Sequence, residues 1–187
     1  MTAPPTWPDA RADHRAPRPV TLAAGSFESP IGRLGLFATE AGLAKVAFEA
    51  EEADQTARMV AEQLGATPVD QPERLDPVKR QLEQYFDRGR RIFDLKLDLS
   101  LIHGFTLAVI KRLNILPYGR TISYGDIAKA VGQPDAARAV GRACSANPVP
   151  VVVPCHRVVR GDGAVGGFGG GIEIKKALLH LEGVKLQ

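Results

Sequence analysis

The 187-residue chain has only two cysteines, Cys144 and Cys155. Two thiols are too few for a disulfide scaffold, and neither forms a metal-ligand cluster with the four histidines. No apolar run is long enough to span a membrane, and the N-terminus lacks the apolar stretch of a signal peptide. We therefore expect a cytoplasmic protein with reduced thiols, no metal site and no membrane partner.

The first 19 residues are rich in proline and charge and have few apolar side chains. Such a segment buries too little apolar surface to offset the entropy of ordering, so we predict a disordered tail. The chain as a whole is 44% hydrophobic, which suits one or two compact units with real cores. We place a domain boundary near residue 100.

Residues 20–100 have the patterns of a small α/β unit. Short apolar runs within residues 20–49 predict a hairpin in an antiparallel sheet. Residues 51–64 are predicted to be helical, and a second helix begins with Asp76 as its N-cap. Apolar and polar side chains alternate over residues 93–99, which predicts a half-buried strand. Acids, bases and nucleophiles do not cluster in this unit, so we interpret it as a scaffold without chemistry.

Residues 101–187 are mainly helical by pattern and more basic. Residues 1–100 carry 13 Lys and Arg against 16 Asp and Glu, and the remainder carries 11 against 5, so the net charges are −3 and +6. Two short predicted helices, 123–130 and one starting near Ala136, flank a turn with glycine and proline, which is typical of a helix-turn-helix. Such pairs are commonly just packing units. Arg138 and Arg142, one turn apart on the second helix, favour a DNA-facing helix instead.

The strongest motif is Pro154-Cys155-His156-Arg157-Val158, which follows the apolar run 151–153. A thiol becomes a nucleophile when its anion is stabilised or a base takes its proton. The alternative is an inert core thiol, because cysteine is among the most buried residue types. Prolines on both sides of a predicted short strand, and a glycine-rich segment at 166–171 that lets backbone approach a ligand, favour a reactive site. A plain flexible connector would have the same glycines.

Three stretches of the C-terminal half resemble the 6-O-alkylguanine-DNA alkyltransferases: "PYGRTISYGDIAKAVG", "ARAVGRACSANPVPVVVPCHRVV" and "GAVGGFGGGIEIKKALLHLEG". A weaker resemblance covers roughly residues 20–100. The resemblance to this family implies an α/β protein with two domains. The N-terminal domain would be a small α/β, ribonuclease-H-like domain, and the C-terminal domain would be mainly helical and contain a winged-helix or helix-turn-helix. The implied activity is that of a methylated-DNA-[protein]-cysteine S-methyltransferase.

That activity is direct DNA repair. An alkyl group, such as methyl, moves irreversibly and once per protein from the 6-oxygen of guanine, or the 4-oxygen of thymine, in double-stranded DNA to a cysteine. The resemblance implies a monomer that needs no cofactor. It assigns the acceptor role to Cys155, proton removal through a water to His156, and stabilisation of the imidazolium to Glu182. Tyr124 matches the tyrosine that helps base flipping and assists the leaving guanine.

The DNA contacts implied by the resemblance lie on the helix pair, which the family places in the minor groove. Arg138 matches the arginine that fills the space of the extruded guanine. Arg142 is a second DNA-binding candidate, and Asn147 would hold the turn that brings the recognition helix against the cysteine segment. The substrate-pocket candidates are Val158, Phe168, Gly169 and Cys144. At Phe168-Gly169 the family usually has Tyr or another aromatic followed by a small hydroxyl residue or glycine, so a phenol is lost here.

Two other functions are compatible with parts of the sequence. One is a non-catalytic module of the alkyltransferase-like type that binds alkylguanine lesions, but those proteins replace the cysteine, commonly with tryptophan, and Cys155 argues against it. The other is a thiol hydrolase that uses Cys155 and His156 with turnover. Arg157 stays open between a role at the site and that of a structural ion-pair partner, pointing away from Cys155 if the motif is a strand.

Overall fold

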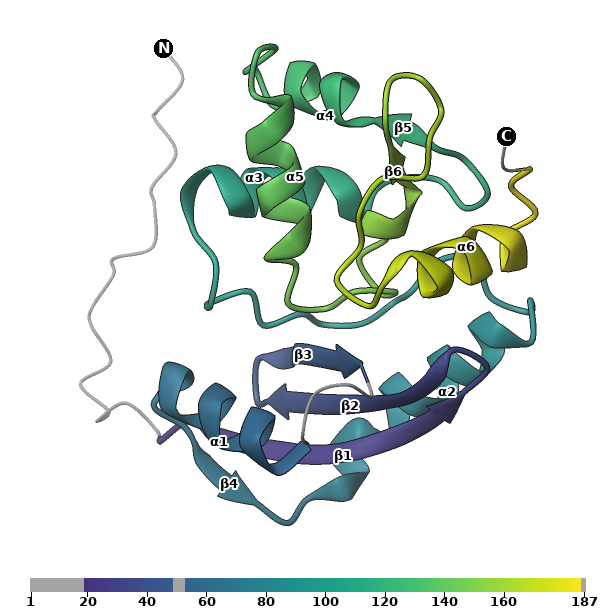
Figure 1. The fold of residues 1–187 in the computed structure, drawn as a ribbon. Helices are drawn as coiled ribbons and strands as arrows, with labels where there is room; N and C mark the ends of the chain where they lie inside the picture. Colours follow the sequence, from purple (N-terminus) through teal and green to yellow (C-terminus); the bar gives the residue numbers. More distant parts are fainter. Residues whose placement is uncertain (1–18, 49–52, 186–187) are drawn as a thin grey trace, which may run out of the picture.

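The computed structural model describes residues 19–48 and 53–185. The predicted disordered tail, residues 1–19, therefore lies outside the described residues apart from Pro19. A four-stranded sheet with its helices occupies one side of the molecule, and a mainly helical half is stacked over strand β3 on the other (Figure 1). The predicted α/β class is confirmed. None of the helices in these two ranges is long and apolar enough to cross a membrane.

The sheet has the order β3-β2-β1-β4, with antiparallel pairs β1/β2 and β2/β3 and a parallel pair β1/β4. The predicted hairpin is confirmed as β2 and β3. The first predicted helix, 51–64, is confirmed as α1 from residue 53 onward, and residues 51 and 52 lie outside the described residues. The elements of this half are β1 (Thr21–Ser29), β2 (Gly32–Thr39), β3 (Gly42–Phe48), α1 (Ala53–Leu64), β4 (Thr67–Val69), the 3-10 turn η1 (Pro72–Leu75) and α2 (Asp76–Phe86).

Two details of this half differ from the prediction. Asp76 is not an N-cap, because η1 runs directly into α2 and Leu75, already in helical conformation, takes the capping position without a side-chain bond. The predicted strand over residues 93–99 is wrong, since only Leu97 forms a bridge, to Leu43. The edge of β3 is shared: the N–H of Leu43 donates to Lys96 (2.9 Å), while that of Val46 donates to Pro148 in the other half (2.8 Å). The segments that contain Lys96 and Pro148 therefore each pair with β3 over only a short stretch.

The helical half contains the predicted helix pair, α4 and α5. Ser123 caps α4 by accepting a hydrogen bond from the N–H of Asp126 (3.0 Å), and Gly132 has a positive φ of 78° in the turn that follows. Strands β5 and β6 pair in parallel, so the described residues form no antiparallel wing from them, and the winged-helix detail is not confirmed. The elements are α3 (Gly104–Asn114), β5 (Ile122–Ser123), α4 (Tyr124–Ala130), α5 (Ala137–Ser145), the 3-10 turn η2 (Cys155–Arg157), β6 (Val158–Val159) and α6 (Ile172–Leu181).

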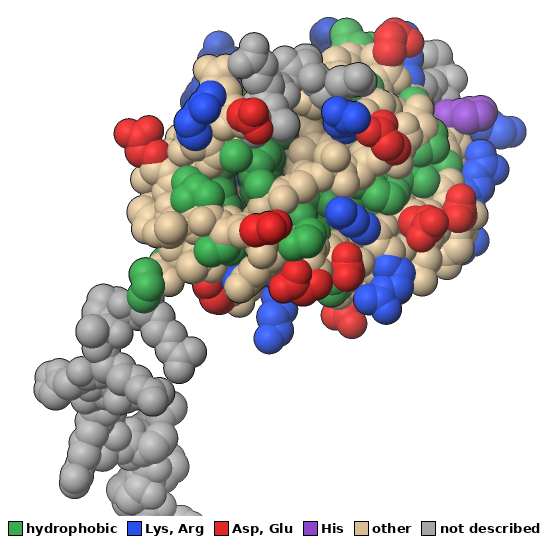
Figure 2. Space-filling model, turned by 90° about the horizontal axis from the view of Figure 1, so that it is seen from below, with side chains coloured by type: hydrophobic (Ala, Val, Ile, Leu, Met, Phe, Trp, Pro, Cys, Tyr) green, Lys and Arg blue, Asp and Glu red, His purple; other side chains and the backbone are tan. Residues whose placement is uncertain are grey.

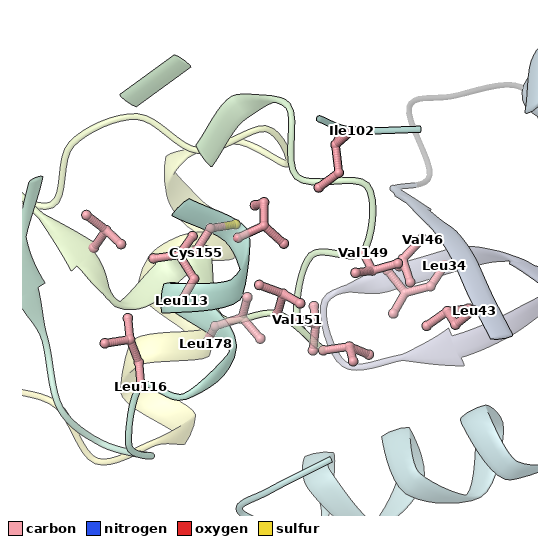
Figure 3. Close-up of a cluster of buried hydrophobic side chains, with 14 of the residues drawn as sticks. Leu34, Leu43, Val46, Ile102, Leu113, Leu116, Val149, Val151, Cys155 and Leu178 are labelled. Atoms are coloured by element: carbon pink, nitrogen blue, oxygen red, sulfur yellow. The ribbon is translucent and has the colours of Figure 1, made fainter. Parts of the chain in front are cut away.

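One hydrophobic cluster extends through both halves (Figure 3). Leu34 and Val46 of the sheet are fully or almost fully buried in it together with Val149 and Val151, which precede the cysteine motif. Burial of apolar area stabilises at about 25 cal/mol per Å², so this shared core holds the sheet against the segment that carries Cys155. The sheet half therefore holds the cysteine motif in position.

Candidate active site

The cysteine motif lies on a tight turn, and the predicted short strand around residues 151–153 is wrong. Val151 has a φ of +73°, which is strained for a β-branched residue, and the N–H of Val153 donates to the carbonyl of Val149 (2.9 Å). The flanking prolines lack the N–H groups that a ladder needs. The chain then enters the 3-10 turn Cys155–Arg157, which is buried throughout.

A cavity of about 410 Å³ has Cys155 in its wall. Its volume is in the range of small-molecule sites. Three of the four predicted pocket residues line it, whereas Val158 is fully buried in β6 and is not part of the lining. The lining residues come from α4, α5, η2 and the glycine-rich segment: Tyr124, Gly141, Cys144, Ser145, Cys155, Gly167, Phe168 and Gly169.

The thiol of Cys155 is held by Asn147. The side-chain amide of Asn147 donates to the carbonyl of Val153 (2.9 Å) and contacts the sulfur (3.1 Å), and its oxygen accepts from the N–H of Val149 (3.1 Å). Burial raises the pKa of Cys155 to about 11, although the Asn147 contact opposes it. Burial likewise raises the pKa of Cys144 to about 12. Neither thiol is therefore an anion at neutral pH without help from a base.

His156, the next residue in the chain, has one ring nitrogen that is free to accept a proton. Its Nε2 lies 2.9 Å from Glu182, and a carboxylate only accepts hydrogen bonds, so Nε2 carries the proton and Nδ1 has the free lone pair. Nδ1 is buried and has no hydrogen-bond partner among the described residues. Burial lowers the pKa of His156, while Glu182 opposes this shift. A neutral imidazole with an open acceptor can take a proton.

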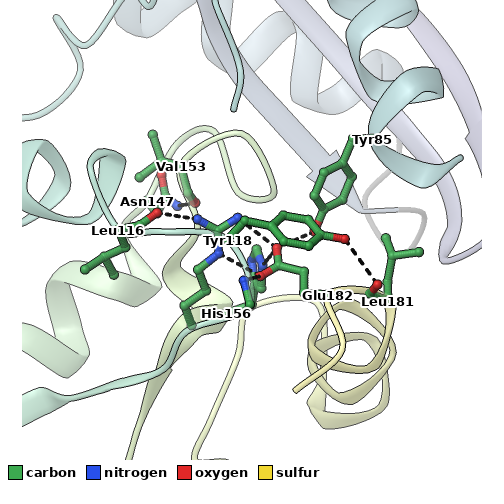
Figure 4. A network of polar contacts seen from close by, with 10 residues as sticks. Tyr85, Leu116, Tyr118, Asn147, Val153, His156, Leu181 and Glu182 are labelled. Carbon is green, nitrogen blue, oxygen red and sulfur yellow. Dashed lines mark hydrogen bonds and ion pairs between the residues drawn. The ribbon is translucent and has the colours of Figure 1, made fainter. Parts of the chain in front are cut away.

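Glu182 is the centre of a buried polar network (Figure 4). Its Oε1 accepts from Tyr85 (2.7 Å), His156 (2.9 Å) and Arg157 Nη2 (2.8 Å), and its Oε2 accepts from Arg157 Nε (2.8 Å) and the N–H of Gly119 (3.0 Å). Burial alone would raise the pKa of Glu182, but the hydrogen bonds from His156 and Arg157 hold this pKa far below its usual range. The carboxylate therefore stays charged. Arg157 forms an ion pair, and because its partner is Glu182 of the proposed site, the pair fits both alternatives for Arg157.

Two buried polar residues of the site were missed by sequence reasoning, Tyr85 and Lys175. Lys175 on α6 has no exposed surface, and its Nζ donates to the carbonyls of Val158 (2.6 Å) and Gly167 (3.2 Å). It therefore ties β6 to the glycine-rich segment that lines the cavity. Its Nζ also lies 5.9 Å from the ring centre of Tyr124, which is half-buried.

The exposed face of α5 presents the predicted DNA-binding arginines. Arg138 and Arg142 are exposed, whereas Val140 and Ala143 on the same helix are buried. Because Cys144 of this helix lines the cavity, α5 connects the arginines to the site. On the opposite side of the molecule, seen from below, acidic and basic side chains are interspersed and no basic stripe is visible (Figure 2).

Comparison with known proteins gives two family matches that together span most of the chain. Residues 22–99 match the 6-O-methylguanine DNA methyltransferase ribonuclease-like domain. Residues 104–184 match the 6-O-methylguanine DNA methyltransferase DNA binding domain. Both assignments agree with the resemblance of the two halves.

Two relatives match over 80% or more of their own length. A methylated-DNA–protein-cysteine methyltransferase of Methanosarcina acetivorans is 40% identical over 160 residues, which are 84% of this chain and 96% of the relative. The protein of the same name from Rattus norvegicus is 37% identical over 169 residues, covering 84% and 80%. Among solved structures, Mycobacterium tuberculosis OGT in complex with DNA has a TM-score of 0.74 at 38% identity and covers 86% of this chain and 93% of that chain.

Proposed function

The chain belongs to the 6-O-methylguanine DNA methyltransferase family, and on that premise we propose that Cys155 accepts the alkyl group. The protein repairs alkylated double-stranded DNA by moving an alkyl group to one of its own cysteines, the activity for which its relatives are named. The observation that carries the assignment to Cys155 is its place on the cavity wall, next in sequence to His156, whose Nε2 is hydrogen-bonded to Glu182.

The proposed step is a direct displacement at the alkyl carbon. The sulfur of Cys155 forms the new S–C bond while the bond from that carbon to the 6-oxygen of guanine breaks, and the electron pair leaves with guanine. The thiol proton goes through a water to Nδ1 of His156, whose positive charge Glu182 stabilises. Tyr124, on the cavity wall, assists the leaving base by hydrogen bonding. The thioether product has no easy hydrolysis route, so the protein reacts once.

Mass spectrometry tests this assignment. After incubation with an excess of duplex oligonucleotide containing 6-O-methylguanine, the protein is expected to gain one methyl group, on the peptide with Cys155. The oligonucleotide is expected to recover unmodified guanine in equal amount. Methylation elsewhere in the chain, or more than one repaired base per protein, would refute the proposal.

We further propose that Arg138 fills the gap left by the extruded base. It stands at the first turn of α5, is exposed, and shares that helix with the cavity. Extrusion costs a few kcal/mol, and a side chain in the gap offsets part of that cost. Arg142, one turn further along, would contact the phosphates.

Arg138→Ala is expected to slow repair of duplex DNA by about 30-fold, equivalent to ~2 kcal/mol, and to change the reaction with free 6-O-benzylguanine by less than about twofold. Single-turnover rates on the two substrates measure the difference. Arg33→Ala is the matched control. Arg33 is also an exposed arginine, but it lies on β2, far in sequence from the cysteine motif. Equal losses on duplex and free base would assign Arg138 another role.

The cellular setting follows from the substrate. DNA is the partner of this family, and an acceptor thiol must stay reduced, so we propose that the protein acts in the cytoplasm of its cell. All groups of the proposed site come from one chain, which supports action as a monomer.

A further inference from the structure

A polar group of the sheet half belongs to the proposed site. Tyr85 on α2 is fully buried, and its hydroxyl donates a 2.7 Å hydrogen bond to Oε1 of Glu182, 97 residues further along the chain. The same oxygen receives the proton of His156 Nε2 (2.9 Å). Tyr85 and His156 therefore compete for one carboxylate oxygen, which Arg157 Nη2 also contacts (2.8 Å).

We propose that Tyr85 is a positioning residue for alkyl transfer, and that its hydroxyl sets how strongly Glu182 binds the proton of His156. This inference rests on the proposed role of Cys155 and His156. It gives the α/β half, predicted to be a scaffold without chemistry, a part in the reaction.

The ring and the hydroxyl of Tyr85 have separate functions. The ring packs against Phe86 (5.3 Å between centres), Phe93 (5.3 Å) and Tyr118 (6.1 Å), and this packing is retained when only the oxygen is removed. Burial and the neighbouring Glu182 raise the pKa of Tyr85 far above its usual value, so the hydroxyl keeps its proton and remains a donor. Loss of the hydroxyl therefore changes one hydrogen bond to Glu182 and little else.

The direction of the effect follows from the competition. A donor to a carboxylate takes up part of its negative charge, which leaves less to stabilise a protonated imidazole. Without the Tyr85 hydroxyl, Glu182 holds the His156 proton more tightly and the imidazole pKa rises. His156 must be neutral to accept the thiol proton, so the pH below which transfer slows also rises.

Other charged and titratable groups face the pair from every element packed against it. None of them is altered by removal of the Tyr85 hydroxyl. They are Tyr118 after α3, Arg157 in η2, Lys175 on α6, and two arginines that act on Tyr118, Arg88 and Arg91; the guanidinium carbon of Arg91 lies 5.7 Å from the Tyr118 ring centre.

The test is the pH profile of alkylation by free 6-O-benzylguanine, which removes DNA binding from the measurement. The acid limb of this profile is the pH range in which the rate falls because His156 becomes protonated. In Tyr85→Phe we expect the acid limb to move up by about half to one pH unit. Rates on that limb then fall about three- to tenfold, and rates on the plateau stay within about twofold. A 3,5-difluorotyrosine at position 85 keeps the ring and is a stronger donor, so it is expected to move the limb down.

Tyr118→Phe is the matched control. Its hydroxyl lies in the same cluster but donates to the carbonyl of Leu181 (3.2 Å), so the limb should stay in place. The inference is overturned if the acid limb of Tyr85→Phe does not move. It is also overturned if phenylalanine and difluorotyrosine move the limb in the same direction. Both conclusions hold even where a variant is less stable than the wild type. A wild-type protein that is not benzylated at Cys155 would instead refute the proposed function on which the inference rests.

Discussion

Replacing Cys155 with serine is expected to abolish alkyl transfer and to leave binding to duplex DNA within about twofold. A hydroxyl is a far weaker nucleophile than a thiolate, and loss of a nucleophile costs about a thousandfold or more in rate. The exposed arginines of α5 are not touched by the change. Intact mass after exposure to a 6-O-methylguanine duplex measures transfer, and an electrophoretic shift assay measures binding.

Cys144→Ala is the matched control, because both cysteines line the same cavity. Burial raises the pKa of Cys144 to about 12, and among the described residues no hydrogen bond joins its thiol to a base. We expect Cys144→Ala to transfer at a rate within about threefold of the wild type, since only a small pocket contact is lost. Methyl transfer to the Cys155→Ser protein would show that Cys144 or another group is the acceptor.

The helix pair could be predicted from the sequence because its signals are local. The cap at Ser123 accepts from Asp126, three residues on, and the turn needs the positive φ that glycine at position 132 adopts without strain. The resemblance added the roles of Cys155 and His156, which are neighbours in sequence. Local chemistry of this kind is visible before any fold is known.

The remainder depends on long-range contacts. Residues 93–99 alternate as a strand does, but strand formation needs a free sheet edge, and β3 divides its edge between two segments. Tyr85 occupies an apolar position of α2, which predicts burial but not a partner 97 residues away. Lys175 has the sequence context of a surface lysine, and only the two carbonyls at its Nζ explain its complete burial.

Glu182→Gln is expected to lower the free energy of unfolding by about 3–5 kcal/mol at neutral pH, because it leaves the buried guanidinium of Arg157 without a counter-charge. For a chain of this size the melting temperature should fall by about 10 °C. The reaction with free 6-O-benzylguanine should also slow by about 100-fold, since an amide does not stabilise the imidazolium that forms. Thermal unfolding and single-turnover kinetics measure the two effects.

The pH dependence separates this ion pair from packing effects. The pKa of Glu182 is lowered in the folded protein, so its contribution to stability is fully present above the unfolded value of about 4.3. That contribution is lost as the pH falls below this value toward the lowered folded pKa. The stability difference between wild type and Glu182→Gln should therefore be constant from about pH 6 to 8 and shrink in acid.

Glu173→Gln is the matched control for this pH series. It lies on the same helix, α6, and its 2.9 Å pair with Lys176 is exposed. Exposed pairs contribute little because water screens them, so we expect almost no change in melting temperature. A stability difference for Glu182→Gln that does not shrink in acid would mean that the glutamine disturbs packing, and that the charge of Glu182 does not stabilise the fold.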